Sequence, residues 1–173
     1  GMICASEQAA IVDKEIYDEV KNEFKEYHAY FASAKEKAML EAFMFGVTKA
    51  SEAANAKLNP NVVGKSAAWI AEQAGFKVPE RTNIICVECK EVGVKEPLTR
   101  EKLSPVLAFI KSDSTEDGMN KSEAMVEFNG LGHSAAIHTA SEELSVEFGK
   151  KVKAIRVIWN SPSTFGGIGN VYN

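Results

Sequence analysis

Cys4 is the first side chain in the sequence that could do covalent chemistry. It lies among small residues in Ile3-Cys4-Ala5-Ser6, shortly before an apolar stretch that is typical of a strand. A thiolate attacks carbonyl carbon readily, and a cysteine nucleophile divides acyl transfer into two easier steps. A free cysteine is also commonly a small buried hydrophobic residue. The residue type alone therefore leaves both interpretations open.

The histidines offer one candidate for proton transfer. His28 falls at the end of a predicted helix and His138 inside a predicted strand, so both are most simply structural. His133 follows Asn129-Gly-Leu-Gly132, a turn before a strand, and functional side chains concentrate on such loops. A histidine bonded to the backbone where a strand begins is an equally good interpretation of the spacing.

Two further segments could contact a ligand. Glu101 precedes Lys-Leu-Ser-Pro and could accept hydrogen bonds from a ribose, as acidic residues do in dinucleotide sites, although most glutamates are simply solvated. Gly166 and Gly167 lie in a glycine-rich tail that predicts a loop and could let the backbone approach a cofactor. Their spacing does not match the dinucleotide-binding fingerprint.

Cys86 and Cys89 form a CxxC pattern without a second pair of ligands, which a zinc site would need. The pattern lies in or at the end of a predicted strand, where residues three apart point to opposite faces. We therefore interpret it as coincidental and expect no bound metal.

The elements that must position these residues alternate between helix and strand. Apolar spacing predicts a first helix, with Asp13 as its N-cap, at least as far as Tyr27. Ser33 and Glu36 form a capping-box pattern, so a second helix is expected to begin near Ala34. Gly46 and Gly75 lie where helices should end. Further helices are expected over residues 66–74, 116–128 and 142–151, and strands over residues 82–87, 106–110, 134–139 and 155–159. This alternation indicates an α/β layer with parallel strands.

The composition is that of an ordinary globular protein. The chain has 173 residues, which predicts one domain, and a formal charge of −4. That charge gives no electrostatic reason to expect nucleic acid or an anionic membrane as partner. No apolar run approaches the ~18 residues of a membrane span, and no signal-peptide pattern is present. Three cysteines do not make a disulfide framework, so a cytoplasmic location is expected.

Five blocks of sequence, in order, resemble the CoA-acylating aldehyde dehydrogenases, and most closely the aldehyde dehydrogenase half of the bifunctional aldehyde–alcohol dehydrogenases. The blocks span essentially the whole chain: MICASEQAAIVDKEIYDEV, NPNVVGKSAAWIAEQAGFKVPERT, KEVGVKEPLTREKLSPVLAFIK, MVEFNGLGHSAAIH and NSPSTFGGIGNVYN. The resemblance implies a three-layer αβα catalytic domain with a mostly parallel sheet. In that family a cysteine attacks an aldehyde, hydride passes to NAD, and CoA takes the acyl group from the resulting thioester. Small aldehydes, acyl-CoA and a second copy of the chain are then the expected partners.

The resemblance also implies roles for individual residues. Cys4 matches the nucleophile, with its backbone N–H in the oxyanion hole, and His133 matches a histidine that assists CoA thiol chemistry. Glu101 matches a glutamate that contacts the ribose on the nicotinamide side. Leu103 stands where many non-acylating relatives carry an aromatic residue beside the nicotinamide.

The family places a nucleotide-binding domain before the cysteine, whereas here only three residues precede Cys4, and Gly1-Met2 is typical of a cloning scar. We therefore expect residues 1–173 to be an isolated catalytic domain that lacks the nucleotide-binding domain and the C-terminal remainder. Such a domain should be inactive by itself and bind neither cofactor appreciably. The alternative is a non-catalytic remnant that associates through uncovered apolar surface.

Overall fold

The computed structural model describes residues 4–168 of the chain. Its strands are β1 (Ala9–Asp13), β2 (Ala29–Phe31), β3 (Ile84–Cys89), β4 (Val106–Ser112), β5 (Ser134–Ile137) and β6 (Arg156–Trp159). Its α-helices are α1 (Tyr17–Glu26), α2 (Ala34–Phe45), α3 (Ala67–Ala74), α4 (Thr115–Asn129), α5 (Glu142–Lys151) and α6 (Ser163–Ile168). Short 3-10 helices span Ala50–Asn55, Pro60–Val62 and Pro97–Thr99.

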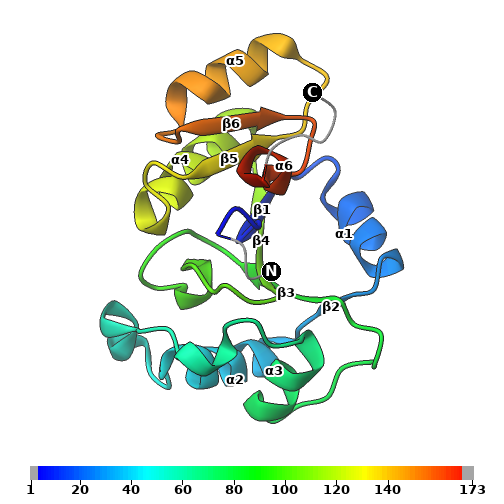
Figure 1. The fold of residues 1–173 in the computed structure, drawn as a ribbon, viewed down its shortest axis with the longest axis vertical. Helices are drawn as coiled ribbons and strands as arrows, with labels where there is room; N and C mark the ends of the chain where they lie inside the picture. Colours follow the sequence, from blue (N-terminus) through cyan, green and yellow to red (C-terminus); the bar gives the residue numbers. More distant parts are fainter. Residues whose placement is uncertain (1–3, 169–173) are drawn as a thin grey trace.

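The main sheet is parallel throughout and has the strand order β1-β4-β3-β2. Ala9 pairs with Ala108, and Val87 pairs with the same residue from the other side, so β4 is a central strand. The chain thus forms the parallel α/β layer that the alternation of helices and strands predicts. Figure 1 shows this sheet in the middle of the molecule, with α2 and α3 below it.

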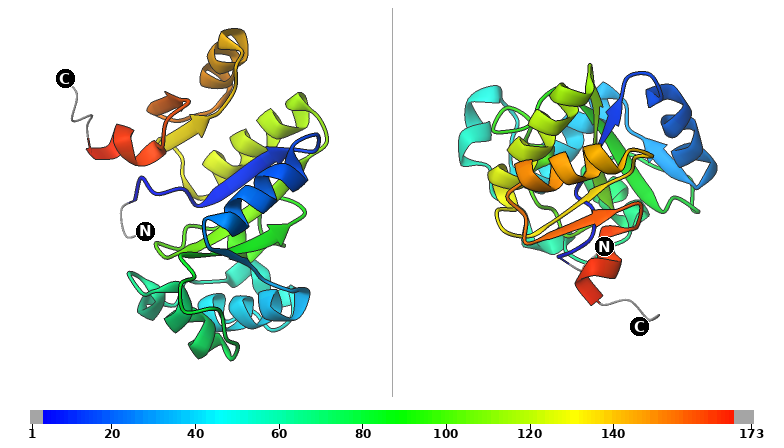
Figure 2. Two further views of the ribbon diagram at one scale, coloured as in Figure 1. Left: turned by 90° about the vertical axis from the view of Figure 1, so that its right-hand side faces the viewer. Right: turned by 90° about the horizontal axis from the view of Figure 1, so that it is seen from above.

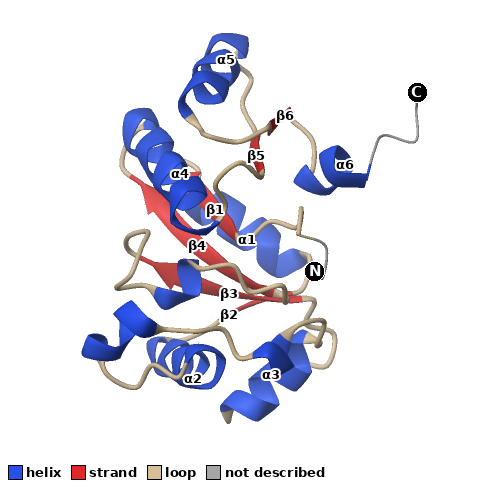
Figure 3. Ribbon diagram, turned by 60° about the vertical axis from the view of Figure 1, so that its left-hand side comes forward, coloured by secondary structure: helices blue, strands red, loops and turns tan. Residues whose placement is uncertain are grey.

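Both faces of the main sheet are buried. In β4, Val106, Ala108 and Ile110 pack into one cluster with residues of α2 and α3. The alternate residues Leu107 and Phe109 pack into a second cluster with residues of α1. Because side chains alternate along a strand, the same segment contributes to two cores, one on each face. Figure 3 shows the helices on either side of the red strands, which makes the three layers of the predicted fold.

A second, two-stranded parallel sheet pairs β5 with β6, with Ala135 opposite Val157. A third cluster joins this sheet to α4 and α5 through Met119, Val126, Phe148 and Val152. The described residues therefore hold two separate sheets. Figures 1 and 2 show α6 beside the segment that precedes β1.

The capping signals locate several helix ends correctly. The Ser33 side chain accepts from the Glu36 N–H, while Glu36 reaches back to the Ser33 N–H. Gly46 and Gly75 end their helices in the left-handed conformation, with φ of 66° and 99°. Helix α5 spans the residues predicted for it.

Other predictions of local structure are wrong. Asp13 is the last residue of β1, and α1 has Ile16 in the N-cap position. The predicted loop around Gly166 and Gly167 is instead part of α6. His138 lies just beyond the last residue of β5 rather than inside the strand.

Candidate functional site

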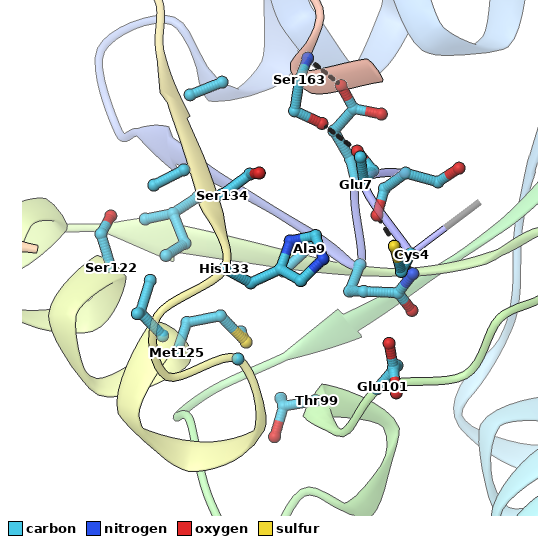
Figure 4. A pocket seen from close by; sticks show the side chains of 18 of the residues that line it. Cys4, Glu7, Ala9, Thr99, Glu101, Ser122, Met125, His133, Ser134 and Ser163 are labelled. Atoms are coloured by element: carbon cyan, nitrogen blue, oxygen red, sulfur yellow. Dashed lines mark hydrogen bonds between the residues drawn. The ribbon is translucent and has the colours of Figure 1, made fainter. Parts of the chain in front are cut away.

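A cavity of about 220 Å³ lies between the first strand of the main sheet and the first strand of the small sheet. Its lining comes from the Cys4 segment, β1, the segment before β4, α4, β5, α5 and α6. The lining residues are Cys4, Ala5, Ser6, Glu7, Gln8, Ala9, Ile11, Thr99, Glu101, Ser122, Met125, Val126, Gly130, His133, Ser134, Ala135, Ala136, Phe148 and Ser163. Three of the predicted site residues, Cys4, Glu101 and His133, thus border one cavity, as Figure 4 shows.

The segment that carries Cys4 is a turn held in place by hydrogen bonds from α6 and by one within the segment. The Ser163 hydroxyl donates to the Ala5 carbonyl, and the Ser163 N–H donates to a Glu7 carboxylate oxygen at 2.9 Å. Figure 4 shows both bonds reaching from α6 to this segment. Further along, the Gln8 amide donates to the Ser6 carbonyl at 3.1 Å. Cys4 itself is exposed, so its thiol can meet a substrate.

His133 lies at the end of a glycine turn that feeds β5. Gly132 has φ of 76°, which favours glycine, and the His133 N–H donates to the Gly130 carbonyl at 2.9 Å. The His133 carbonyl accepts from the Ile155 N–H at 3.0 Å. The backbone of His133 is therefore fixed, and Figure 4 shows its ring between β5 and the Cys4 segment. The interpretation of His133 as a histidine bonded to the backbone holds for its main chain. Its imidazole ring borders the cavity.

Glu101 lies on the loop before β4 and is exposed at the edge of the cavity. Its carboxylate accepts no hydrogen bond from another residue among those the structure describes, so its oxygens can accept from a ligand. The next residue, Lys102, is fully buried. Burial lowers the pKa of its ammonium group to about 7. Sequence reasoning missed Lys102, because lysines are almost never fully buried.

Two of the other predicted cofactor residues, Leu103 and Gly166, are not among those that line this cavity. Leu103 does not line it, and its backbone is left-handed, with φ of 45°. Gly166 is inside α6, where an added Cβ would lie 2.8 Å from the Ile158 Cδ1 atom. Packing against β6 thus accounts for the absence of a side chain at Gly166. Gly167 follows it in the same helix.

Cys86 and Cys89 also lie away from the cavity, and both are buried in β3. Cys86 packs with the cluster on the α1 face, and Cys89 with the cluster on the α2 face. The two thiols therefore point to opposite faces, as the strand periodicity predicts. Within residues 4–168, no group of three or more His, Cys, Asp or Glu side chains is arranged to hold a metal ion. No described helix is both long and apolar enough to cross a membrane.

Curated relatives match the chain from end to end. The aldehyde-alcohol dehydrogenase of Streptococcus pneumoniae serotype 4 is 72% identical over 174 residues, and aldehyde-alcohol dehydrogenase 2 of Entamoeba histolytica is 60% identical over 174 residues. The bifunctional aldehyde-alcohol dehydrogenase of Escherichia coli K12 is 39% identical over 176 residues. Each match covers 100% of this chain but only 19–20% of the relative. The chain therefore spans about one fifth of the length of these proteins. No protein-family model matches it.

Solved structures extend the match to the fold. An acetylating aldehyde dehydrogenase from Geobacillus thermoglucosidasius superposes with a TM-score of 0.89 at 36% identity, over 100% of this chain and 36% of that one. A probable aldehyde dehydrogenase from Listeria monocytogenes gives 0.89 at 35% identity, over 99% and 36%. Over its whole length, the chain is thus a homologue of one segment from the aldehyde dehydrogenase region of the aldehyde–alcohol dehydrogenases, with the fold of the acetylating aldehyde dehydrogenases.

Proposed function

We propose that this chain is the catalytic-domain segment of a CoA-dependent acylating acetaldehyde dehydrogenase. Such an enzyme converts an aldehyde, CoA and NAD reversibly to acyl-CoA and NADH. The observation that carries the proposal is the meeting of Cys4, Glu101 and His133 around one small cavity. These residues come from three separate parts of the sequence, and each belongs to a block that resembles the family.

In this proposal Cys4 is the nucleophile. Its Sγ adds to the aldehyde carbonyl carbon, a carbon–sulfur bond forms, and the carbonyl π electrons move to oxygen. The Cys4 backbone N–H is assigned to the oxyanion that results, since a fixed donor stabilises charge that develops on oxygen. The hydrogen bonds from Ser163 to Ala5 and Glu7 hold the turn that presents both groups.

When bound, NAD supplies the hydride acceptor and CoA supplies the acyl acceptor. Glu101 fits NAD, because its carboxylate is exposed at the cavity that Cys4 also lines and is available to ribose hydroxyl donors. His133 fits CoA. Its imidazole accepts the proton of the CoA thiol as that sulfur bonds to the acyl carbon. The bond between this carbon and the Cys4 Sγ then breaks, and Cys4 leaves as a thiolate.

Replacing the nucleophile tests the proposal. We define the chimeric enzyme as the full-length S. pneumoniae aldehyde-alcohol dehydrogenase in which this chain replaces the matching segment. Cys4→Ala in the chimeric enzyme should reduce CoA- and NAD-dependent acetaldehyde oxidation to background, because no other described cysteine borders the cavity. The matched control is Cys86→Ala, which removes a buried thiol that does not line the cavity and should retain turnover. Turnover that survives Cys4→Ala would contradict the assignment.

We further propose that the 173-residue chain has no turnover by itself. Its cavity of about 220 Å³ is smaller than the roughly 300–1,000 Å³ of sites for drug-sized ligands, so it suits a small aldehyde better than a dinucleotide. Calorimetry should detect negligible NAD binding to the folded chain, whereas a micromolar dissociation constant would overturn this view.

A second candidate function, association with another copy of the chain, is favoured by one observation. Ile155, Val157 and Trp159 in and beside β6 are 78%, 37% and 44% exposed, and β6 is an edge strand of the small sheet. An apolar edge strand is a template for pairing with a second strand. Sedimentation velocity should show a concentration-dependent dimer that Val157→Lys weakens. The control Val146→Lys, at a 50% exposed valine on α5, should leave it intact. A monomer at all concentrations would exclude this function.

A further inference from the structure

Lys102 is the most unusual side chain in the described structure. It has no solvent exposure, and its Nζ donates to three backbone carbonyls, those of Gln8 at 3.1 Å, Leu98 at 2.8 Å and Arg100 at 2.8 Å. Among the described residues no carboxylate lies within ion-pair distance of Nζ. Lys102 also does not line the cavity, so it can affect the chemistry only through the groups it holds.

Burying a lysine at this position lowers the free energy of unfolding of the chain. Burying an ammonium group without a carboxylate is unfavourable, and only the three carbonyl acceptors, which match its three donors, offset the cost. A well-packed apolar residue would serve a core position at lower cost. Residues in an environment that their type normally avoids, such as a fully buried lysine, concentrate at functional sites.

The bonds of Lys102 join the two segments that carry Glu101 and Cys4. Its Nζ binds the Gln8 carbonyl, and its backbone N–H donates to Gln8 Oε1 at 2.9 Å. The Gln8 amide then reaches the Ser6 carbonyl at 3.1 Å, two residues from Cys4. A continuous chain of hydrogen bonds thus runs from the residue after Glu101 to the turn that presents Cys4.

The backbone beside Lys102 needs such an anchor. Leu103 has φ of 45°, a left-handed conformation that is unfavourable for a non-glycine residue. The Leu103 carbonyl accepts from the Gly64 N–H at 3.2 Å, so the strained residue is tied on its far side as well. Strained backbone persists only where its surroundings determine it completely.

We propose that Lys102 is a positioning residue whose buried side chain fixes the Glu101 loop relative to the Cys4 segment. The inference rests on the proposed function, in which Glu101 and Cys4 act on the same bound substrate and cofactor. Their relative placement matters because a misplacement of about 1 Å can reduce a rate by about a hundredfold.

A double-mutant cycle in the chimeric enzyme tests the proposal. Lys102→Met and Glu101→Gln should each lower kcat/KM for NAD by about tenfold, and the double variant should lose about tenfold rather than about a hundredfold. Such non-additivity is expected if Lys102 acts through Glu101. A merely structural role would give losses that multiply, and that result would overturn the proposal. The matched control is Lys121→Met, because the Lys121 Nζ also donates to a backbone carbonyl, that of Lys111 at 2.7 Å, and neither Lys121 nor its ion-pair partner Asp117 lines the cavity. It should stay within about twofold of the parent.

Gln8→Met keeps the proposal testable if Lys102→Met fails to fold. It removes the amide bridge between the Lys102 N–H and the Ser6 carbonyl and keeps the bond from Lys102 Nζ to the Gln8 carbonyl, and it should also be non-additive with Glu101→Gln. Losses that multiply in this cycle would likewise overturn the proposal.

Hydrogen–deuterium exchange on the 173-residue chain separates this inference from the proposed function. Lys102→Met should speed exchange in peptides covering residues 4–8 and 98–103, while Lys121→Met, whose bonds reach Lys111 and Asp117, should not. Unchanged exchange would overturn the positioning role even if the chimeric enzyme is active. Turnover that survives Cys4→Ala would instead overturn the proposed function and leave the exchange result standing.

Discussion

At the scale of single residues, the three cysteines occupy two kinds of environment. Burial raises the pKa of the Cys86 thiol and of the Cys89 thiol to about 12. Both are therefore protonated and inaccessible at neutral pH, and they behave as small apolar side chains. Cys4 is exposed at the cavity.

This difference predicts selective alkylation. Iodoacetamide at pH 8 should modify Cys4 in the folded chain and leave Cys86 and Cys89 unmodified, because a thiolate and access are both required. Mass spectrometry of the intact chain should show one added group, and three after denaturation in urea. Modification of Cys86 or Cys89 as fast as Cys4 in the native chain would show that β3 opens readily.

The burial of Lys102 could not be predicted from the residue types around it. The sequence offers Glu101 as a candidate because carboxylates bind ribose hydroxyls, but nothing in Glu-Lys-Leu-Ser-Pro distinguishes a buried lysine from a solvated one. Its three acceptors are backbone carbonyls, two on its own loop and one on the segment after Cys4. Only the folded chain brings them together.

At the scale of elements, the sequence predicts both ends of a helix correctly where the helix carries its own capping residues. Ser33, Glu36 and Gly46 define both ends of α2, and Ser66 and Gly75 define α3. The cap of α1 could not be found this way. Asp13 has the residue type of an N-cap, but β1 pairs with β4 as far as Asp13, and the helix begins only at Tyr17. Tertiary pairing decided that boundary.

The short helix α6 was unpredictable for a related reason. Glycines disfavour helices by ~1 kcal/mol each, so Phe165-Gly-Gly-Ile was expected to be a loop. The bonds of Ser163 to Glu7 and Ala5, which lie 156 and 158 residues away, are outside any local window.

The capping box gives a stability prediction for α2. Ser33→Ala should lower the free energy of unfolding by about 1 kcal/mol, because the Glu36 N–H loses its side-chain acceptor. Urea denaturation followed by circular dichroism measures the change. Ser51→Ala, within the 3-10 helix Ala50–Asn55, is a control that should change stability by less than about 0.5 kcal/mol. Equal effects of the two substitutions would show that the cap does not stabilise the fold.

At the scale of the whole molecule, the cavity lies at an unexpected edge of the sheet. Ligands in open α/β sheets usually bind beyond the carboxyl ends of the strands. Here Ala9 and Ser134, the first residues of β1 and β5, border the cavity, and so does Glu101 from the loop before β4. The resemblance identified the residues, but periodicity and the general rule for such sheets would have pointed to the opposite edge.

The stability of the chain should rise with pH from about 7 to about 9 and then fall. In the folded chain burial lowers the pKa of Lys102 to about 7 from 10.5, so above pH 7 the unfolded chain holds a proton that the folded chain has released. Raising the pH then favours folding, by at most about 1.4 kcal/mol per pH unit. Above pH 9 the trend reverses. Cys86 and Cys89 lose their protons near pH 9.0 when unfolded but only near 12 when folded.

Urea midpoints at pH 7, 8, 9 and 10 would measure this profile. Lys102→Met should flatten the rise between pH 7 and 9 and leave the fall above pH 9 in place. The Glu101 carboxylate favours the ammonium form of Lys102, so the rise is the net result of burial against this charge. An identical slope in both proteins would show that Lys102 remains protonated throughout.

The link between α6 and the Cys4 turn also sets an order of events during synthesis. Ser163 bonds to Ala5 and Glu7, which precede it by 158 and 156 residues. At about 5–20 residues per second, a ribosome makes Ser163 on the order of ten seconds after Cys4. Within this segment the thiol therefore leaves the ribosome well before Ser163 is made, and its turn is fixed only after α6 is available. A nascent chain should form the β1–β4 sheet before it acquires the nucleophile geometry.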